Sequence, residues 1–181
     1  MTNAGVFLDR DGVLTAPVIT DGKPGSPALA SEMEILPEAL PACRALANAG
    51  LLRICVTNQP EIARGHLELA ELAKMNERLE RELELDDLIF CPHDDAAGCE
   101  CRKPKPGMIL DGAHRFGIDD LSQSFTVGDR WRDIDAGNAA GTRTVHIERG
   151  YAEGLKSSPE VSVAGIAEAA EWIIEQHRLA G

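Results

Sequence analysis

Five aspartates follow two short apolar runs and are the first candidates for chemistry in this sequence. Asp9 and Asp11 come directly after AGVFL, and Asp129, Asp133 and Asp135 follow SFTVG. Buried carboxylates need a compensating cation, and oxygen ligands suit a hard ion such as Mg²⁺. The alternatives are an Asp-Gly turn for the first pair and, for Asp133 and Asp135, the first turn of a helix, where the helix dipole favours acidic residues. Asp9 and Asp129 are therefore the strongest candidates for a cation site, and the contribution of Asp133 stays open.

Two further segments carry groups that suit phosphoryl oxygens. VTNQ at 56–59 offers the hydroxyl of Thr57 and the amide of Asn58, although Thr-Asn at a strand end is also ordinary turn chemistry. CRKPKPGM at 101–108 places Arg102, Lys103 and Lys105 beside two prolines, which stiffen the loop and can aim a lysine. A cationic cluster is unexpected in a chain of net charge −12, so we interpret it as an anion site. A solvated basic turn is the alternative, and it is the better one for Lys105.

The segment CPHDDAAGCEC predicts a zinc site. Three thiolates and one imidazole make a complete tetrahedral set, which leaves no position for water, so the site should be structural. Unrelated free thiols are the alternative. The two remaining cysteines stand in apolar surroundings and are expected to be inert core residues. The predicted Zn²⁺ ligands are Cys91, His93, Cys99 and Cys101.

Length and composition indicate one globular domain over residues 1–181. The chain has 44% hydrophobic and 27% charged residues, which excludes disordered and collagen-like proteins. Its net charge of −12 disfavours nucleic acid and anionic membranes as partners, but not a small phosphorylated metabolite. The sequence shows neither a signal peptide nor an apolar run near the roughly 20 residues of a membrane span. Together with the five cysteines, an odd number, this predicts a cytoplasmic protein.

Hydrophobic periodicity predicts alternating strands and helices. Strands are expected at 4–9, 51–58, 86–91, 124–129 and 142–148, and helices at 37–50, 67–83, 106–117, 131–141 and 163–179. Residues 15–36 are rich in Gly, Pro and Ser and are expected to form a long irregular loop. The alternation predicts a three-layer α/β fold with a mostly parallel sheet. Ligands bind beyond the carboxyl ends of such strands, so the polar groups named above should meet in one crevice.

These motifs resemble the haloacid-dehalogenase (HAD) superfamily. DRDG, TNQ, CRKPKPGM and GDRWRD occur in the family's order, and the match extends from Phe7 to about Tyr151. The Cys-x-His and Cys-x-Cys pairs and the IARG string at 62–65 are typical of the small, capless subfamily IIIA, which includes heptose-bisphosphate phosphatases and the histidinol-phosphatase domain. The resemblance implies a capless Rossmann-like phosphatase with a zinc-binding loop.

The resemblance also implies roles for the residues of the motifs. Asp9 matches the nucleophile that forms an aspartyl phosphate, and Asp11 matches the general acid and base. Asp9, the backbone carbonyl of Asp11 and Asp129 match the Mg²⁺ ligands, while Thr57 and Lys103 match the groups that bind the transferring phosphoryl oxygens.

Substrate recognition is implied for four residues: Asn58, Arg64, Arg102 and Arg130. More arginines than one phosphate needs favour a bisphosphate, such as D-glycero-D-manno-heptose 1,7-bisphosphate, over histidinol phosphate. Pro60 stands where many relatives have serine, and residues 15–34 differ from the substrate loop of typical heptose enzymes. A catalytically silent, zinc-stabilised binding module is the alternative from another class. The sequence does not set the oligomeric state, for which a monomer is one option.

Overall fold

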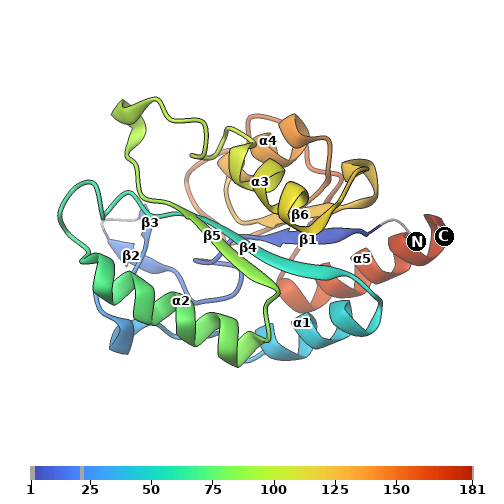
Figure 1. Ribbon diagram of the computed structural model, residues 1–181, viewed down its shortest axis with the longest axis horizontal. Helices are drawn as coiled ribbons and strands as arrows, with labels where there is room; N and C mark the ends of the chain where they lie inside the picture. Colours follow the sequence, from blue (N-terminus) through green and yellow to red (C-terminus); the bar gives the residue numbers. More distant parts are fainter. Residues whose placement is uncertain (1–2, 21–22, 181) are drawn as a thin grey trace.

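A six-stranded parallel sheet forms the centre of the protein, in a computed structural model that describes residues 3–20 and 23–180 (Figure 1). Residues 1–2 and 181 of the expected domain, and residues 21–22 of the expected loop, lie outside the described part. All neighbouring strands of the sheet pair in parallel. The strand order is β5 (Asp87–Cys91), β4 (Leu52–Asn58), β1 (Gly5–Leu8), β6 (Phe125–Gly128), β7 (Arg143–Ile147) and β8 (Val161–Val163).

Strand β1 lies at the middle of the sheet because both of its faces are apolar. All four of its residues are buried, and Phe7 pairs with Ile54 of β4 and Thr126 of β6. Val6 and Leu8 belong to one hydrophobic cluster and Phe7 to another, as the alternation of side chains along a strand requires. The two clusters are the two layers of core, one on each face of the sheet.

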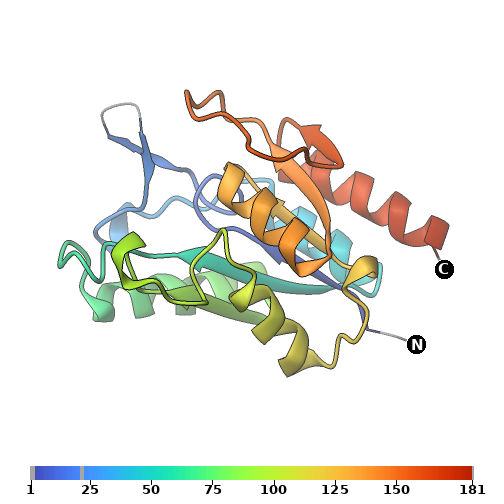
Figure 2. The same cartoon turned by 90° about the horizontal axis from the view of Figure 1, so that it is seen from above.

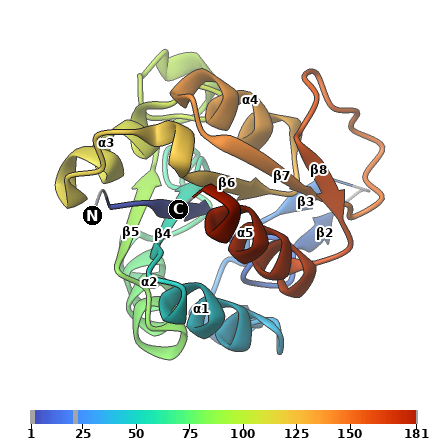
Figure 3. The same ribbon diagram turned by 90° about the vertical axis from the view of Figure 1, so that its right-hand side faces the viewer.

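Helices cover both faces of the sheet, as Figure 3 shows. One layer contains α1 (Ala39–Asn48), α2 (Leu69–Leu83) and α5 (Ile166–Ala180), and the other contains α3 (Gly107–Phe116) and α4 (Trp131–Ala140). Each of these helices was expected, with bounds within a few residues of those observed. None of the helices in the described part is long and apolar enough to cross a membrane.

The expected loop 15–36 contains regular structure that the sequence analysis did not predict. β2 (Val18–Thr20) and β3 (Lys23–Gly25) pair as an antiparallel hairpin, and a short 3₁₀ helix follows at Ala30–Glu32. β8, which extends the sheet beyond β7, was also not expected. Each of these strands has three residues, too few for a two-residue period to stand out from its surroundings.

The carboxyl ends of the parallel strands all lie along one edge of the sheet. The strand order reverses its direction between β1 and β6. The chain passes from β1 to β4 and β5 on one side, and from β6 to β7 and β8 on the other. Ligands bind at such a reversal in open parallel sheets. Figure 2 shows the β2–β3 hairpin, the loop after β5 and the segment after β7 at this same end. The described residues between β1 and α1 form the hairpin and the 3₁₀ helix rather than a cap domain, so the expected capless fold is confirmed.

Candidate active site and cysteine cluster

A cavity of about 790 Å³ opens at the carboxyl end of the sheet. The residues that line it come from the ends of β1, β4 and β6, from the hairpin, and from the loops after β5 and β7. All the residues predicted to act in catalysis or substrate binding line it: Asp9, Asp11, Thr57, Asn58, Arg64, Arg102, Lys103 and Arg130.

Three buried carboxylates lie together beside this cavity. Asp9 follows β1, Asp129 follows β6, and Asp133 lies in the first turn of α4. Their oxygens lie within 4.8 Å of one another. Lys103 is in contact with two of them: its Nζ lies 2.8 Å from Asp9 Oδ1 and 2.5 Å from Asp133 Oδ1, and it also donates to the Val56 carbonyl at 2.8 Å. The cluster therefore holds more carboxylates than this ammonium group pairs.

Burial, together with the neighbouring charges, changes the pKa values of the cluster. Burial raises the pKa of Asp9 to about 6, with Lys103 opposing the rise. Burial and the charges of Asp9 and Asp133 raise the pKa of Asp129 well above its ordinary value. Burial alone would lower the pKa of Lys103, but its ion pairs with Asp133 and Asp9 outweigh burial and raise it.

The cluster fits a divalent cation. Asp129 is only 3% exposed, and its Oδ1 is buried with no hydrogen-bond partner among the described residues. A buried carboxylate oxygen without a donor is costly unless a cation faces it. Asp133 is already engaged by Lys103 and by the backbone N–H of Arg130. The free coordination capacity thus lies with Asp9 and Asp129, the pair that the sequence favoured.

The Asn58 amide is bound to the loop that carries Lys103. Its Nδ2 donates to the carbonyl of Lys103 at 3.0 Å, and its Oδ1 accepts from the backbone N–H of Lys103 at 3.0 Å. These two bonds join the end of β4 to the loop that carries Lys103. Asn58 therefore fixes the position of this loop. It also lines the cavity, and the substrate contact expected from the sequence stays a prediction.

Asp11 lies at the centre of a network of donors. The guanidinium of Arg10, which is completely buried, donates to its carboxylate at 2.9–3.2 Å. Ser26, just after the hairpin, donates to Oδ2 at 2.7 Å, Gln59 donates to the same oxygen at 3.2 Å, and Thr15 donates to Oδ1 at 3.2 Å. This network holds the Asp11 side chain in place and links it to the hairpin.

Thr57 is buried and is one of the residues that line the cavity. Gln59 Nε2 donates to Thr57 Oγ1 at 2.9 Å. Because the oxygen accepts this bond, the Thr57 proton can donate to an anion. That role, expected from the sequence, stays a prediction.

The arginines at the rim are each paired with an acid. The side chain of Arg102 is only 11% exposed. Its guanidinium donates to the carbonyl of His93, and this bond holds the Arg102 side chain against the loop after β5. Arg132, which the sequence analysis did not single out, shares the acid partner of Arg102 at 2.9 Å. The pairs of the predicted arginines are Arg64 with Glu61, Arg102 with Asp95, and Arg130 with Glu153.

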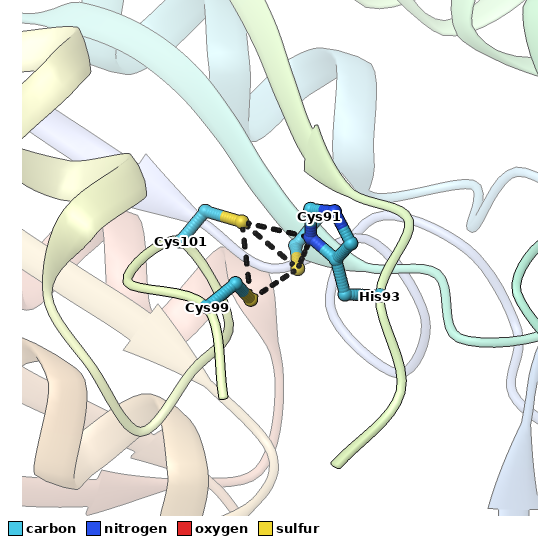
Figure 4. Close-up of side chains that lie close together, drawn as sticks. All are labelled: Cys91, His93, Cys99 and Cys101. Atoms are coloured by element: carbon cyan, nitrogen blue, oxygen red, sulfur yellow. Dashed lines mark hydrogen bonds between the residues drawn. The ribbon is translucent and has the colours of Figure 1, made fainter. Parts of the chain in front are cut away.

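The four predicted zinc ligands converge in the loop after β5 (Figure 4). The sulfur atom of Cys101 lies 3.1 Å from that of Cys91 and 3.4 Å from that of Cys99, and 3.3 Å from Nδ1 of His93. Zn–S bonds of about 2.3 Å give sulfur–sulfur edges of about 3.8 Å in a tetrahedron, so small outward movements would admit the ion. Burial raises the pKa of Cys99, but hydrogen bonds from neighbouring groups outweigh it and lower that pKa to about 7. The donor set therefore fits Zn²⁺.

Several residues of the site were missed by the sequence analysis. Asp95, Gln59 and Tyr151 each contact a predicted site residue from another segment of the chain. Gln59 is the last residue of the TNQ motif, so the motif itself could have identified it as a site residue. Asp95 and Tyr151 have no comparable signal, because their importance comes from contacts across the fold.

Comparison with known proteins agrees with this geometry. A model of the family described as HAD-hydrolase-like matches residues 100–169. The chain is 36% identical over 156 residues to D-glycero-beta-D-manno-heptose-1,7-bisphosphate 7-phosphatase of Pseudomonas aeruginosa, which covers 83% of this chain and 84% of that protein. The chain belongs to the HAD-like hydrolase family. The relatives are phosphatases, and this chain is a phosphatase of the family. The protein of the same name from Yersinia pestis is 31% identical to this chain over 181 residues, and the alignment covers 93% of this chain and 88% of that protein.

A solved structure supports the same assignment. The D,D-heptose 1,7-bisphosphate phosphatase of Bordetella bronchiseptica, crystallised with magnesium and phosphate, superposes with a TM-score of 0.79 at 30% identity. The alignment covers 96% of this HAD phosphatase and 99% of that chain. The HAD fold expected from the sequence is thereby confirmed.

Proposed function

We propose that this HAD phosphatase is a Mg²⁺-dependent phosphomonoesterase that removes the 7-phosphate of a heptose 1,7-bisphosphate through an aspartyl phosphate. The single observation that carries the reaction type is the cluster in which Asp9 is paired with Lys103 and lies beside Asp129, whose buried Oδ1 has no hydrogen-bond partner among the described residues. The names of the relatives and the magnesium and phosphate in the Bordetella structure support the substrate and the cation.

Asp9 is the nucleophile in this proposal. Its carboxylate stands at the end of the central strand and lines the cavity, where an oxygen can attack phosphorus in line with the leaving group. A cation held by Asp9 and Asp129 would neutralise charge between the nucleophile and the phosphate dianion. Attack forms an Asp9–phosphorus bond and breaks the phosphorus–oxygen bond to the sugar.

Lys103 and Thr57 bind the phosphoryl oxygens during the transfer. Lys103 is 3% exposed, and its three N–H donors point at two carboxylates and a carbonyl. One of these bonds must therefore be exchanged for a phosphoryl oxygen when the substrate binds. Asp133 holds Lys103 in place by an ion pair. Asp133 also accepts from the N–H of Arg130, which ties the start of α4 to the site.

Asp11 serves as the acid for the departing sugar hydroxyl and as the base that activates water for hydrolysis of the aspartyl phosphate. One carboxylate cannot serve as nucleophile and acid in the same step, so a second one is needed. Arg10 holds Asp11 in place, and the bond from Ser26 links it to the hairpin, so contact between hairpin and substrate can reorient the acid.

Substrate choice is assigned to the arginine rim. Each arginine now binds a carboxylate side chain, and a phosphate with two negative charges can compete for the same donors. Arg102 is the best placed, since the proposed zinc loop holds its backbone and Asp95 holds its side chain at the cavity wall. A second phosphate on the substrate would bind here.

The test compares kcat/KM for heptose 1,7-bisphosphate, heptose 7-phosphate and histidinol phosphate. The wild-type protein should prefer the bisphosphate, and Arg102→Ala should reduce that preference about tenfold or more while changing histidinol phosphate turnover less. Lys105→Ala is the control, because Lys105 pairs with Glu100 outside the cavity. A preference for histidinol phosphate would overturn the substrate assignment, and no phosphate release from any of the three would overturn the reaction itself.

A further inference from the structure

The segment after β7 is bound to the active site by contacts at several points. Arg149 Nε donates to the carbonyl of Gly12 at 2.8 Å, in the turn that follows β1. Glu153 forms an ion pair with Arg130 at 2.6 Å, at the start of α4. The segment, residues 148–160, contributes Tyr151, Ala152 and Glu153 to the lining of the cavity.

Tyr151 of this segment contacts the acidic cluster directly. Its hydroxyl donates to Asp129 Oδ2 at 2.7 Å, while Asp129 Oδ1 is the buried oxygen that lacks a hydrogen-bond partner in the described part of the chain. The two oxygens of one carboxylate thus have different environments: one accepts from a phenol, and the other is buried with no hydrogen-bond partner among the described residues. The Asp129 carboxylate as a whole belongs to the cluster with Asp9 and Asp133.

A glycine makes room for this pair. Gly12 has φ of +87°, and a Cβ at this position would overlap the Asp129 carboxylate and lie 3.2 Å from Tyr151 Oη. The turn after β1 therefore needs glycine both for its backbone conformation and for the close approach of Asp129 and Tyr151.

We propose that Tyr151 is a positioning residue for the divalent cation: by holding one oxygen of Asp129, it keeps the other directed at the cation. This inference rests on the cation of the proposed function and assigns a role to a residue outside the four motifs. A carboxylate with both oxygens free can rotate about its terminal torsion, and water can hydrogen-bond to either oxygen. The phenol fixes the plane of the carboxylate, which is how outer partners of metal ligands raise affinity.

A purely structural role for Tyr151 makes a different prediction. If the ring only filled space, removal of the hydroxyl would leave the cation site intact. Tyr151→Phe separates the two roles because it keeps the ring and removes the donor.

The experiment measures Mn²⁺ binding by the zinc-loaded protein in the absence of substrate, by electron paramagnetic resonance. We expect Tyr151→Phe to bind Mn²⁺ about tenfold more weakly than the wild type. In a second readout, phosphatase activity of this variant should be lost at low Mg²⁺ and largely recovered at saturating Mg²⁺. Unchanged melting temperature shows that the variant folds.

Ser157→Ala is the matched control on the same segment. Ser157 donates to Asp135 at 2.5 Å and lies outside the cavity, so its loss loosens the segment without removing the Tyr151 bond. Mn²⁺ affinity should stay at the wild-type value. Equal affinities in the wild type and Tyr151→Phe, or equal weakening in Ser157→Ala, would overturn the inference alone. A wild-type protein that binds no Mn²⁺ would overturn the proposed cation as well.

Discussion

At the scale of single residues, Asp9 is where the proposed chemistry can be tested most directly. Asp9→Asn keeps the shape of the side chain but removes the anionic oxygen, so an acyl phosphate cannot form. We expect kcat to fall at least about a hundredfold, which corresponds to about 2.7 kcal/mol of barrier lowering. The measurement is phosphate release together with trapping of the phosphorylated protein by mass spectrometry. Retention of more than about a tenth of the activity would exclude a covalent mechanism.

Asn58 gives a prediction that follows from its contacts rather than from its motif. Asn58→Ala removes both bonds to the backbone of Lys103, each worth about 1 kcal/mol. The free energy of unfolding should therefore fall by about 2 kcal/mol, and kcat should fall with it because Lys103 is no longer fixed. Denaturant titration and steady-state kinetics measure the two effects.

Asn138→Ala is the control for this experiment. Asn138 also makes two side-chain hydrogen bonds, to Ser157 and Thr144, but lies outside the cavity. It should lose similar stability while keeping kcat. If Asn58→Ala raised KM and left stability unchanged, Asn58 would be a substrate contact after all.

At the scale of elements, the loop after β5 is expected to depend on zinc. Removal of the metal should expose three thiols to a reagent such as dithionitrobenzoate, namely those of Cys91, Cys99 and Cys101, and should reduce activity because Lys103 follows the last ligand by two residues. Cys43 and Cys55 should stay unreactive until the protein unfolds, since both are buried and burial raises the pKa of Cys43 to about 12. Five reactive thiols in the folded protein, or no zinc by elemental analysis, would contradict this.

The elements of the sheet were largely predictable, and the contacts between them were not. Long apolar runs and glycine stops identified β1, β4 and all five helices, because burial dictates those residue types locally. The β2–β3 hairpin and β8 were missed, since three residues carry too little pattern. At the site, residue type and strand ends placed Asp9 and Asp129 together. The hydrogen bonds between Asn58 and the Lys103 backbone join residues 45 positions apart, and no local sequence pattern encodes such a contact.

At the scale of the whole molecule, the acidic cluster should lower the stability of the metal-free protein, although the proposed reaction needs these carboxylates. Three buried carboxylates around one lysine repel one another when no cation is bound. Asp129→Asn removes one of these charges, so without Mg²⁺ this variant should melt at a higher temperature than the wild type. Mg²⁺ should raise the melting temperature of the wild type only, by linkage of binding to folding.

Calorimetry with and without Mg²⁺ checks both statements. Lys103→Met is the counterpart, because it removes the single cation and should lower the melting temperature without Mg²⁺ by leaving Asp9 and Asp133 unpaired. A wild type whose melting temperature did not respond to Mg²⁺ would contradict the linkage.

The two candidate metal sites differ in how much of the chain must be present before they exist. Cys91 and Cys101 are separated by ten residues, so their loop can close at small entropic cost as soon as this segment leaves the ribosome. The contact between Asp9 and Lys103 spans 94 residues and needs the parallel pairing of β1 with β4, while Asp129 is synthesised later still. A zinc ion could therefore join the nascent chain and organise the loop early, whereas magnesium can bind only to the finished sheet.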